Sequence, residues 1–160
     1  NVGNLLRLAD CAGLDGVVAC GITPSPPHPR VLKTAVGAAE WVPCARRPSA
    51  LQAVDALRAR GYRVVALETV DGAWSLHDLS PTLAALLQPP VALLLGNELA
   101  GVDARAVAAA DVVVQLPTFG GKNSLNVATA AAAAVYEVLR RWGAGTAESP
   151  ARPLEGGELL

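Results

Sequence analysis

Apolar residues recur along the chain with two periods, one typical of helices and one typical of strands. Near the start, Leu5, Leu6, Ala9 and Ala12 follow helical spacing, which predicts a helix over residues 4–12 that ends at Gly13. The same spacing predicts further helices over residues 30–40, 48–60, 79–87, 104–109 and 124–142. Short apolar runs predict strands over residues 16–20, 41–44, 63–68, 91–95 and 111–116.

Strands and helices alternate along the whole pattern. This order predicts an α/β fold with a mostly parallel sheet and helices on both faces. The run Val91–Leu95 is uniformly apolar, as expected of a strand buried on both faces. Ligands bind such sheets beyond the carboxyl ends of the strands, where three corners are expected at residues 68–72, 96–101 and 116–126.

The third of these corners carries the most informative run of residues. Leu116-Pro117 ends a strand, Gly120-Gly121 forms a loop, and small polar residues precede an Ala-rich helix. Glycines and unpaired backbone N–H groups would let a nucleoside-like cofactor approach the backbone closely. Alternatively, Asn123 or Ser124 is an ordinary N-cap and the glycines are turn residues. Both interpretations fit the corner equally well when it is taken alone.

Composition favours a single domain without a membrane span. Of the 160 residues 52% are apolar, yet no apolar run approaches the roughly 20 residues of a transmembrane helix. The net charge is −1, so binding of a polyanion would depend on local patches. The candidate cations are Arg30 with Lys33, Arg46 with Arg47, Lys122, and Arg140 with Arg141.

The cysteines and the two ends of the chain add further expectations. Cys11, Cys20 and Cys44 have spacings that fit no zinc motif, which predicts buried thiols in a reducing cytoplasm and no metal site. The chain begins within an amphipathic helix, so we expect a first strand to precede it. After Gly143 the sequence turns to Gly, Pro and Glu, and we expect a domain over residues 1–142 and a flexible tail over 143–160.

Three segments together carry a resemblance to a known family. They are residues 1–9 (NVGNLLRLA), 94–101 (LLGNELAG) and 116–127 (LPTFGGKNSLNV). Their order, spacing and content resemble the SpoU (TrmH-like) family of RNA ribose methyltransferases, within the SPOUT superfamily, and the resemblance extends to about residue 141. It implies that the C-terminal segment threads through a loop to form a deep trefoil knot. Composition and periodicity do not indicate a knot.

The resemblance implies that S-adenosylmethionine is bound at the knot, largely by backbone groups of three loops. Gly96, Leu116 and Leu125 match cofactor-contacting positions of the family. Leu67 and Thr69 are weaker candidates for the same pocket, since core packing and a strand-end hydroxyl explain them equally well.

The resemblance also implies a set of catalytic positions. Arg7 matches the family's catalytic arginine, and Asn1, Glu98, Ser124 and Asn126 match its other polar positions. A guanidinium stays protonated in proteins, so binding a phosphate beside the target ribose suits Arg7 better than base catalysis. Glu98 could orient Arg7 or a loop amide, whereas Ser124 could bind substrate or merely cap the helix.

The expected function is therefore S-adenosylmethionine-dependent methylation of a ribose 2′-hydroxyl in tRNA or rRNA. The alternative is a non-catalytic RNA-binding or assembly module that retains the knotted fold. The family implies a cytoplasmic homodimer whose two subunits share each site. A small-residue face of the last helix could pack against a partner or within the monomer, and it comprises Ala128, Ala131, Ala132, Val135 and Leu139.

Overall fold

The computed structural model describes residues 1–97 and 100–144, and all strand pairs within them are parallel. One sheet has the strand order β1-β2 and the other has the order β4-β6-β3-β5. The strands are β1 (Val17–Cys20), β2 (Cys44–Arg47), β3 (Arg63–Leu67), β4 (Trp74–Ser75), β5 (Val91–Leu95) and β6 (Val112–Gln115). The predicted α/β fold with parallel pairing is confirmed, but it is built on two sheets and not on one.

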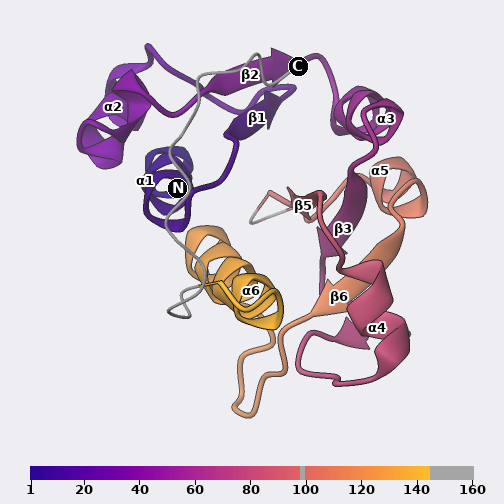
Figure 1. Cartoon of the computed structure of the whole chain (residues 1–160). Coiled ribbons are helices and arrows are strands. Elements are labelled where there is room, and N and C mark those ends of the chain that lie inside the picture. Colours follow the sequence, from indigo (N-terminus) through magenta and orange to yellow (C-terminus); the bar gives the residue numbers. More distant parts are fainter. Residues whose placement is uncertain (98–99, 145–160) are drawn as a thin grey trace.

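Helices alternate with these strands, as the apolar pattern predicts. They are α1 (Val2–Ala12), α2 (Pro29–Ala35), the 3-10 helix η1 (Ala38–Glu40), α3 (Ala50–Ala59), α4 (Pro81–Leu86), α5 (Ala104–Ala108) and α6 (Val127–Arg141). Figure 1 shows α1 and α2 beside the smaller sheet and α3, α4 and α5 around the larger one. Helix α6 contacts both α1 and β5, so it connects the two parts of the fold.

The larger sheet buries apolar side chains on both faces. Val65 belongs to a cluster with Leu83 of α4 and Val138 of α6, whereas Val64 packs with Val54 of α3. Successive residues of a strand point to opposite faces, which explains why neighbouring valines join different clusters. Helices therefore cover both faces of this sheet, as expected. No helix among the described residues has both the length and the apolar character needed to cross a bilayer.

Local chemistry defines where the helices start and stop. Gly13 ends α1 with a φ of 63°, a left-handed conformation that glycine adopts without a steric penalty. Ser49 and Ser80 cap α3 and α4 by accepting backbone N–H groups of the first turn. Asn126 caps α6, because its Oδ1 accepts from the backbone nitrogens of Ala128 at 3.0 Å and Thr129 at 3.3 Å.

Several predicted boundaries are wrong. The helix expected over residues 30–40 is broken at Val36 and Gly37, which both have positive φ. The strand expected over residues 41–44 begins only at Cys44, because the chain still turns after η1. The last helix starts at Val127 and not at residue 124, so neither Asn123 nor Ser124 is its cap. β5 lies at the edge of its sheet and is half-buried, and its residues alternate between the two core clusters, with Leu93 packing on one face and Leu94 on the other.

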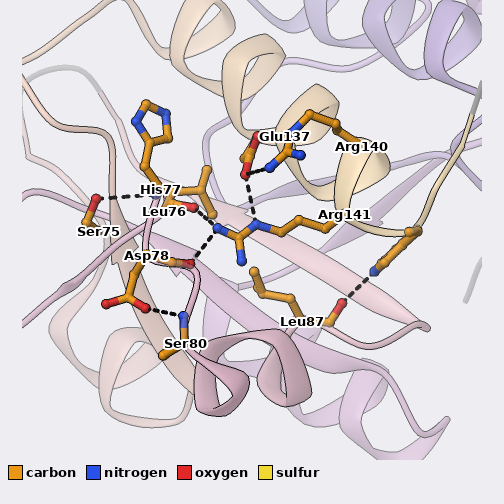
Figure 2. A network of polar contacts seen from close by, with 10 residues as sticks. Ser75, Leu76, His77, Asp78, Ser80, Leu87, Glu137, Arg140 and Arg141 are labelled. Atoms are coloured by element: carbon orange, nitrogen blue, oxygen red, sulfur yellow. Dashed lines mark hydrogen bonds and ion pairs between the residues drawn. The ribbon is translucent and has the colours of Figure 1, made fainter.

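A network of polar contacts ties the end of α6 to the segment that follows β4. Figure 2 shows the Arg141 guanidinium between the backbone carbonyls of Leu76 and Asp78, with its Nε donating to Glu137 at 2.9 Å. The Arg141 side chain is only 10% exposed, whereas the Arg140 side chain is 63% exposed. Arg141 therefore connects α6 to the segment after β4 through hydrogen bonds inside the chain. Its prediction as part of a surface patch is wrong.

Replacing Arg141 should destabilise the fold far more than replacing its neighbour. Arg141→Ala leaves two carbonyls and part of the Glu137 carboxylate without their donor, and we expect a loss of about 3 kcal/mol in the free energy of unfolding. Arg140→Ala removes a largely exposed ion pair and should cost about 1 kcal/mol or less. Urea unfolding of both variants measures the difference. Equal losses of unfolding free energy in the two variants would show that the hydrogen bonds of Arg141 stabilise the fold no more than an exposed ion pair does.

The same network should make the fold sensitive to acid. Hydrogen bonds from Arg140 and then Arg141 hold the pKa of the Glu137 carboxyl below its ordinary value. This contribution is present above the unfolded pKa of about 4.3 and is lost as the pH falls through the lower folded pKa. In urea unfolding below pH 5, Glu137→Gln should therefore lose stability less steeply than the wild type. The exposed Glu40→Gln serves as the matched control, and an identical slope for Glu137→Gln would contradict this assignment.

Candidate functional site

Three corners meet at one edge of the larger sheet because its strands run in register. Leu67, the last residue of β3, pairs with Leu95 of β5 on one side and with Val114 of β6 on the other. The chain therefore leaves all three strands at the same edge. This places the segments that begin at residues 68, 96 and 116 side by side, as the sequence predicts for parallel strands.

The second corner is a tight loop with two glycines packed back to back. A Cβ on Gly96 would lie 2.5 Å from the carbonyl carbon of Gly101 and 2.6 Å from the nitrogen of Val102. Asn97 and Gly101 exchange two backbone hydrogen bonds of 2.9 and 2.8 Å. Gly96 is thus required by the packing of the loop on itself. Glu98, a predicted site residue, lies outside the described residues.

The third corner forms an open pocket of about 350 Å³. Its lining comprises Pro117, Thr118, Phe119, Gly120, Gly121, Lys122, Ser124 and Leu125. Phe119 is 93% exposed and Leu125 is 54% exposed, so apolar surface is presented beside the glycines. Neither glycine would clash if it carried a Cβ, which shows that open space lies next to the backbone here.

Three of the predicted cofactor residues lie where the corners leave the sheet. Leu67 and Leu116 are half-buried and pack against the core of the larger sheet. The hydroxyl of Thr69 donates to the carbonyl oxygen of Asn123 at 3.4 Å, which connects the first corner to the third. Both leucines therefore take part in the core at this edge, and Thr69 joins two loops.

Two of the polar candidates, Asn1 and Asn126, are in direct contact. Asn126 donates from Nδ2 to Oδ1 of Asn1 at 2.8 Å, so the start of α6 contacts the start of α1. Arg7 is exposed on α1, and its side chain forms neither a hydrogen bond nor an ion pair with any of the described residues. Ser124 is also exposed and lines the pocket.

Glu68 is a residue at this edge that the sequence analysis missed. It follows β3 directly and is half-buried, and its Oε2 accepts from the backbone nitrogen of Val102 at 2.9 Å. Its position beyond the carboxyl end of a parallel strand was the one available signal. The corner as a whole was predicted, but a single glutamate there is indistinguishable from a solvated surface residue.

The side chains of two candidate basic residues already have partners within the chain, and one of them, Arg46, holds the loop after β1. Arg46 donates to the hydroxyl of Ser25 at 3.0 Å and to the carbonyl of Gly21 at 3.1 Å. Arg47 donates to the carbonyl of Arg46 at 3.1 Å. Both side chains have internal partners, so they are less available to a polyanion than the sequence suggests.

The cysteines depart in part from expectation. All three are free, but Cys11 is exposed and Cys20 and Cys44 are half-buried, so the prediction of buried thiols is wrong for Cys11. Burial raises the pKa of the Cys20 and Cys44 thiols, and the neighbouring Arg47 and Arg46 partly offset this. Across residues 1–97 and 100–144, no group of three or more His, Cys, Asp or Glu side chains could hold a metal ion.

Comparison with known proteins finds relatives that match most of this chain. Residues 1–136 match the model of the SpoU rRNA Methylase family. RlmP, a 23S rRNA guanosine 2′-O-methyltransferase of Bacillus subtilis, is 37% identical over 140 residues, which are 86% of this chain and 52% of RlmP. A 23S rRNA uridine 2′-O-methyltransferase of Streptomyces viridochromogenes is 32% identical over 155 residues, which are 94% of this chain and 52% of that enzyme.

A solved structure is similar in fold as well. The SpoU methyltransferase AviRb of Streptomyces viridochromogenes, crystallised with the cofactor AdoMet, superimposes with a TM-score of 0.76 at 28% identity. The match covers 88% of this chain and 55% of AviRb. The chain thus spans about half the length of the curated relatives it matches. With the family match and these relatives in agreement, the chain belongs to the SpoU rRNA Methylase family.

Proposed function

We propose that the protein is an S-adenosylmethionine-dependent methyltransferase that acts on a ribose 2′-hydroxyl of tRNA or rRNA. The observation that carries this proposal is the hydrogen bond between Asn1 and Asn126. It brings the segment that holds Arg7 to the start of α6, next to the pocket of the third corner. Two relatives named as 2′-O-methyltransferases of 23S rRNA support the reaction type.

The residues at the third corner fit the proposed cofactor. The adenine ring of the cofactor is flat and largely apolar on its faces, and the pocket offers the exposed side chain of Leu125 beside unobstructed backbone at Gly120 and Gly121. We expect Leu116, Leu67 and Gly96, which end or follow the neighbouring strands at the same edge of the sheet, to complete the cofactor site. AviRb, which is similar in fold, was crystallised with AdoMet, and this supports the choice of cofactor.

The polar residues would act on the RNA. S-adenosylmethionine supplies an electrophilic methyl carbon, and transfer depends on in-line placement of the ribose oxygen, so positioning lowers much of the barrier. Arg7 provides a permanent positive charge for a phosphate next to the target ribose and for the charge that develops on the 2′-oxygen. Ser124 offers a hydroxyl at the pocket, and Asn126 holds the loop against Asn1.

Further features of the family extend this proposal. We expect the C-terminal segment to form the trefoil knot, residues 1–142 to form one domain, and two copies to assemble with shared sites. The small-residue face of α6 gives this dimer little independent support. Ala131 and Val135 on that face are buried within the chain.

A methyl-transfer assay tests the proposal. The protein is incubated with labelled S-adenosylmethionine and bulk tRNA or rRNA, and ribose methylation is mapped as resistance to alkaline cleavage. Arg7→Ala should lower the transfer rate on the order of 100-fold, because one charge-stabilising group is lost. Arg63→Ala is the matched control, since Arg63 is exposed at the opposite end of β3. Cofactor binding without transfer to any RNA would favour the non-catalytic RNA-binding module instead.

A pair of glycine variants tests the cofactor site separately. In Gly96→Ala the new methyl group meets the backbone of Gly101 and Val102, so the second corner must shift. S-adenosylmethionine should then bind more weakly by about 5-fold or more, since overpacking costs about 1–3 kcal/mol. Gly120→Ala meets no protein atom within 4 Å and should fold normally, but because Gly120 lines the proposed pocket, this variant should also bind S-adenosylmethionine more weakly. Calorimetric titration of both variants measures the affinities. Unaltered affinity in Gly96→Ala would remove the second corner from the cofactor site.

A further inference from the structure

Glu68 joins two loops that the sequence separates by more than 30 positions. Its Oε2 accepts from the backbone nitrogen of Val102 at 2.9 Å, and its Oε1 accepts from the backbone nitrogen of Thr69 at 3.1 Å. Both carboxylate oxygens are therefore engaged, one by its own corner and one by the second corner. The half-buried position strengthens such charge-assisted hydrogen bonds.

Glu68 contacts two residues of the second corner, Gly101 and Val102, that pack against Gly96. These two residues are called the Gly101–Val102 arm below. A Cβ on Gly101 would lie 2.9 Å from Oε2 of Glu68, so the carboxylate rests directly on this glycine. Gly101 and Val102 in turn lie against Gly96, the proposed cofactor position. Glu68 thus reaches the backbone at Gly96 indirectly, because it holds the two residues that pack against Gly96.

Helix capping does not account for this contact. Helix α5 begins two residues after Val102, and its N-cap is Asp103, whose Oδ1 accepts from the backbone nitrogen of Arg105 at 2.8 Å. The helix therefore starts without help from Glu68. What Glu68 holds is the loop arm itself.

The adjacent residue reaches the remaining corner. Thr69 donates to the carbonyl of Asn123 at 3.4 Å, in the loop that lines the pocket. Two consecutive residues after β3 therefore contact the second and the third corner respectively. The register of β3 between β5 and β6 places them there.

We propose that Glu68 is a positioning residue that fixes the Gly101–Val102 arm, and through it the backbone at Gly96, for binding of S-adenosylmethionine. This inference rests on the proposed function. Glu68 touches no reacting atom, so its loss should weaken the cofactor affinity while leaving the methyl-transfer step at saturation nearly unaltered.

Side-chain chemistry decides which variant is informative. A glutamine at this position has the same size but only one accepting oxygen, so its NH₂ group would face either the Val102 or the Thr69 amide as a second donor. Glu68→Gln therefore keeps the packing and breaks one hydrogen bond. Glu68→Ala breaks both. Glu40→Gln is the matched control, because Glu40 is exposed and lies on η1 near the smaller sheet.

The test combines three measurements on the whole protein. Hydrogen exchange without cofactor should show the Val102 amide exchanging at least 10-fold faster in Glu68→Ala, since hydrogen bonds to charged groups contribute about 1.5–3 kcal/mol. Titration with S-adenosylmethionine should show affinity weakened about 10-fold in Glu68→Gln and further in Glu68→Ala. Steady-state kinetics should show a raised KM for the cofactor with kcat close to wild type, a split that general destabilisation would not produce.

The outcomes separate this inference from the proposed function. A wild-type protein that does not bind S-adenosylmethionine overturns the proposed function, and the inference with it, before any variant is made. A wild type that binds, together with Glu68 variants of equal affinity, overturns the inference alone. The inference also fails if Val102 exchange is unaltered in Glu68→Ala. If the alanine variant does not fold, the isosteric Glu68→Gln still decides the question.

Discussion

The parallel register of β3 with β5 and β6 is the constraint on which the site depends. Because Leu67 pairs with both Leu95 and Val114, three strands end at one level and release their loops at one edge. In an antiparallel sheet the same loops would leave at opposite ends. Residues separated by tens of positions then become neighbours, and short contacts such as those of Glu68 and Thr69 are enough to hold the loops together.

Helix α6 carries the third corner, and it is fastened at both ends. At its start Asn126 caps the helix and contacts Asn1, while at its end Arg141 binds carbonyls of the segment after β4. These contacts limit how α6 can slide or tilt between α1 and the larger sheet. The loop before α6 is therefore held in a defined position, although it has no regular secondary structure.

The sequence predicts elements correctly where neighbouring residues carry the signal. It predicts wrongly where the position of a side chain depends on a partner far along the chain. Val91–Leu95 was predicted residue for residue, and Gly13 ends α1 as expected. Arg141 was misassigned because an arginine at a helix end ordinarily faces water, and nothing local reveals the carbonyls that receive it. The start of α6 was misplaced for a related reason, since Asn123, Ser124 and Asn126 are all competent caps.

The amino-acid sequence by itself determined the α/β alternation, the parallel pairing, the three corners and the family, because these follow from short-range patterns of apolar, glycine and polar residues. The tertiary structure alone decided the division into two sheets, the contact between Asn1 and Asn126, and the hydrogen bond that the Val102 backbone donates to Glu68. Such contacts join side chains to backbone atoms far along the chain. Their formation depends on distances that only the packed fold sets.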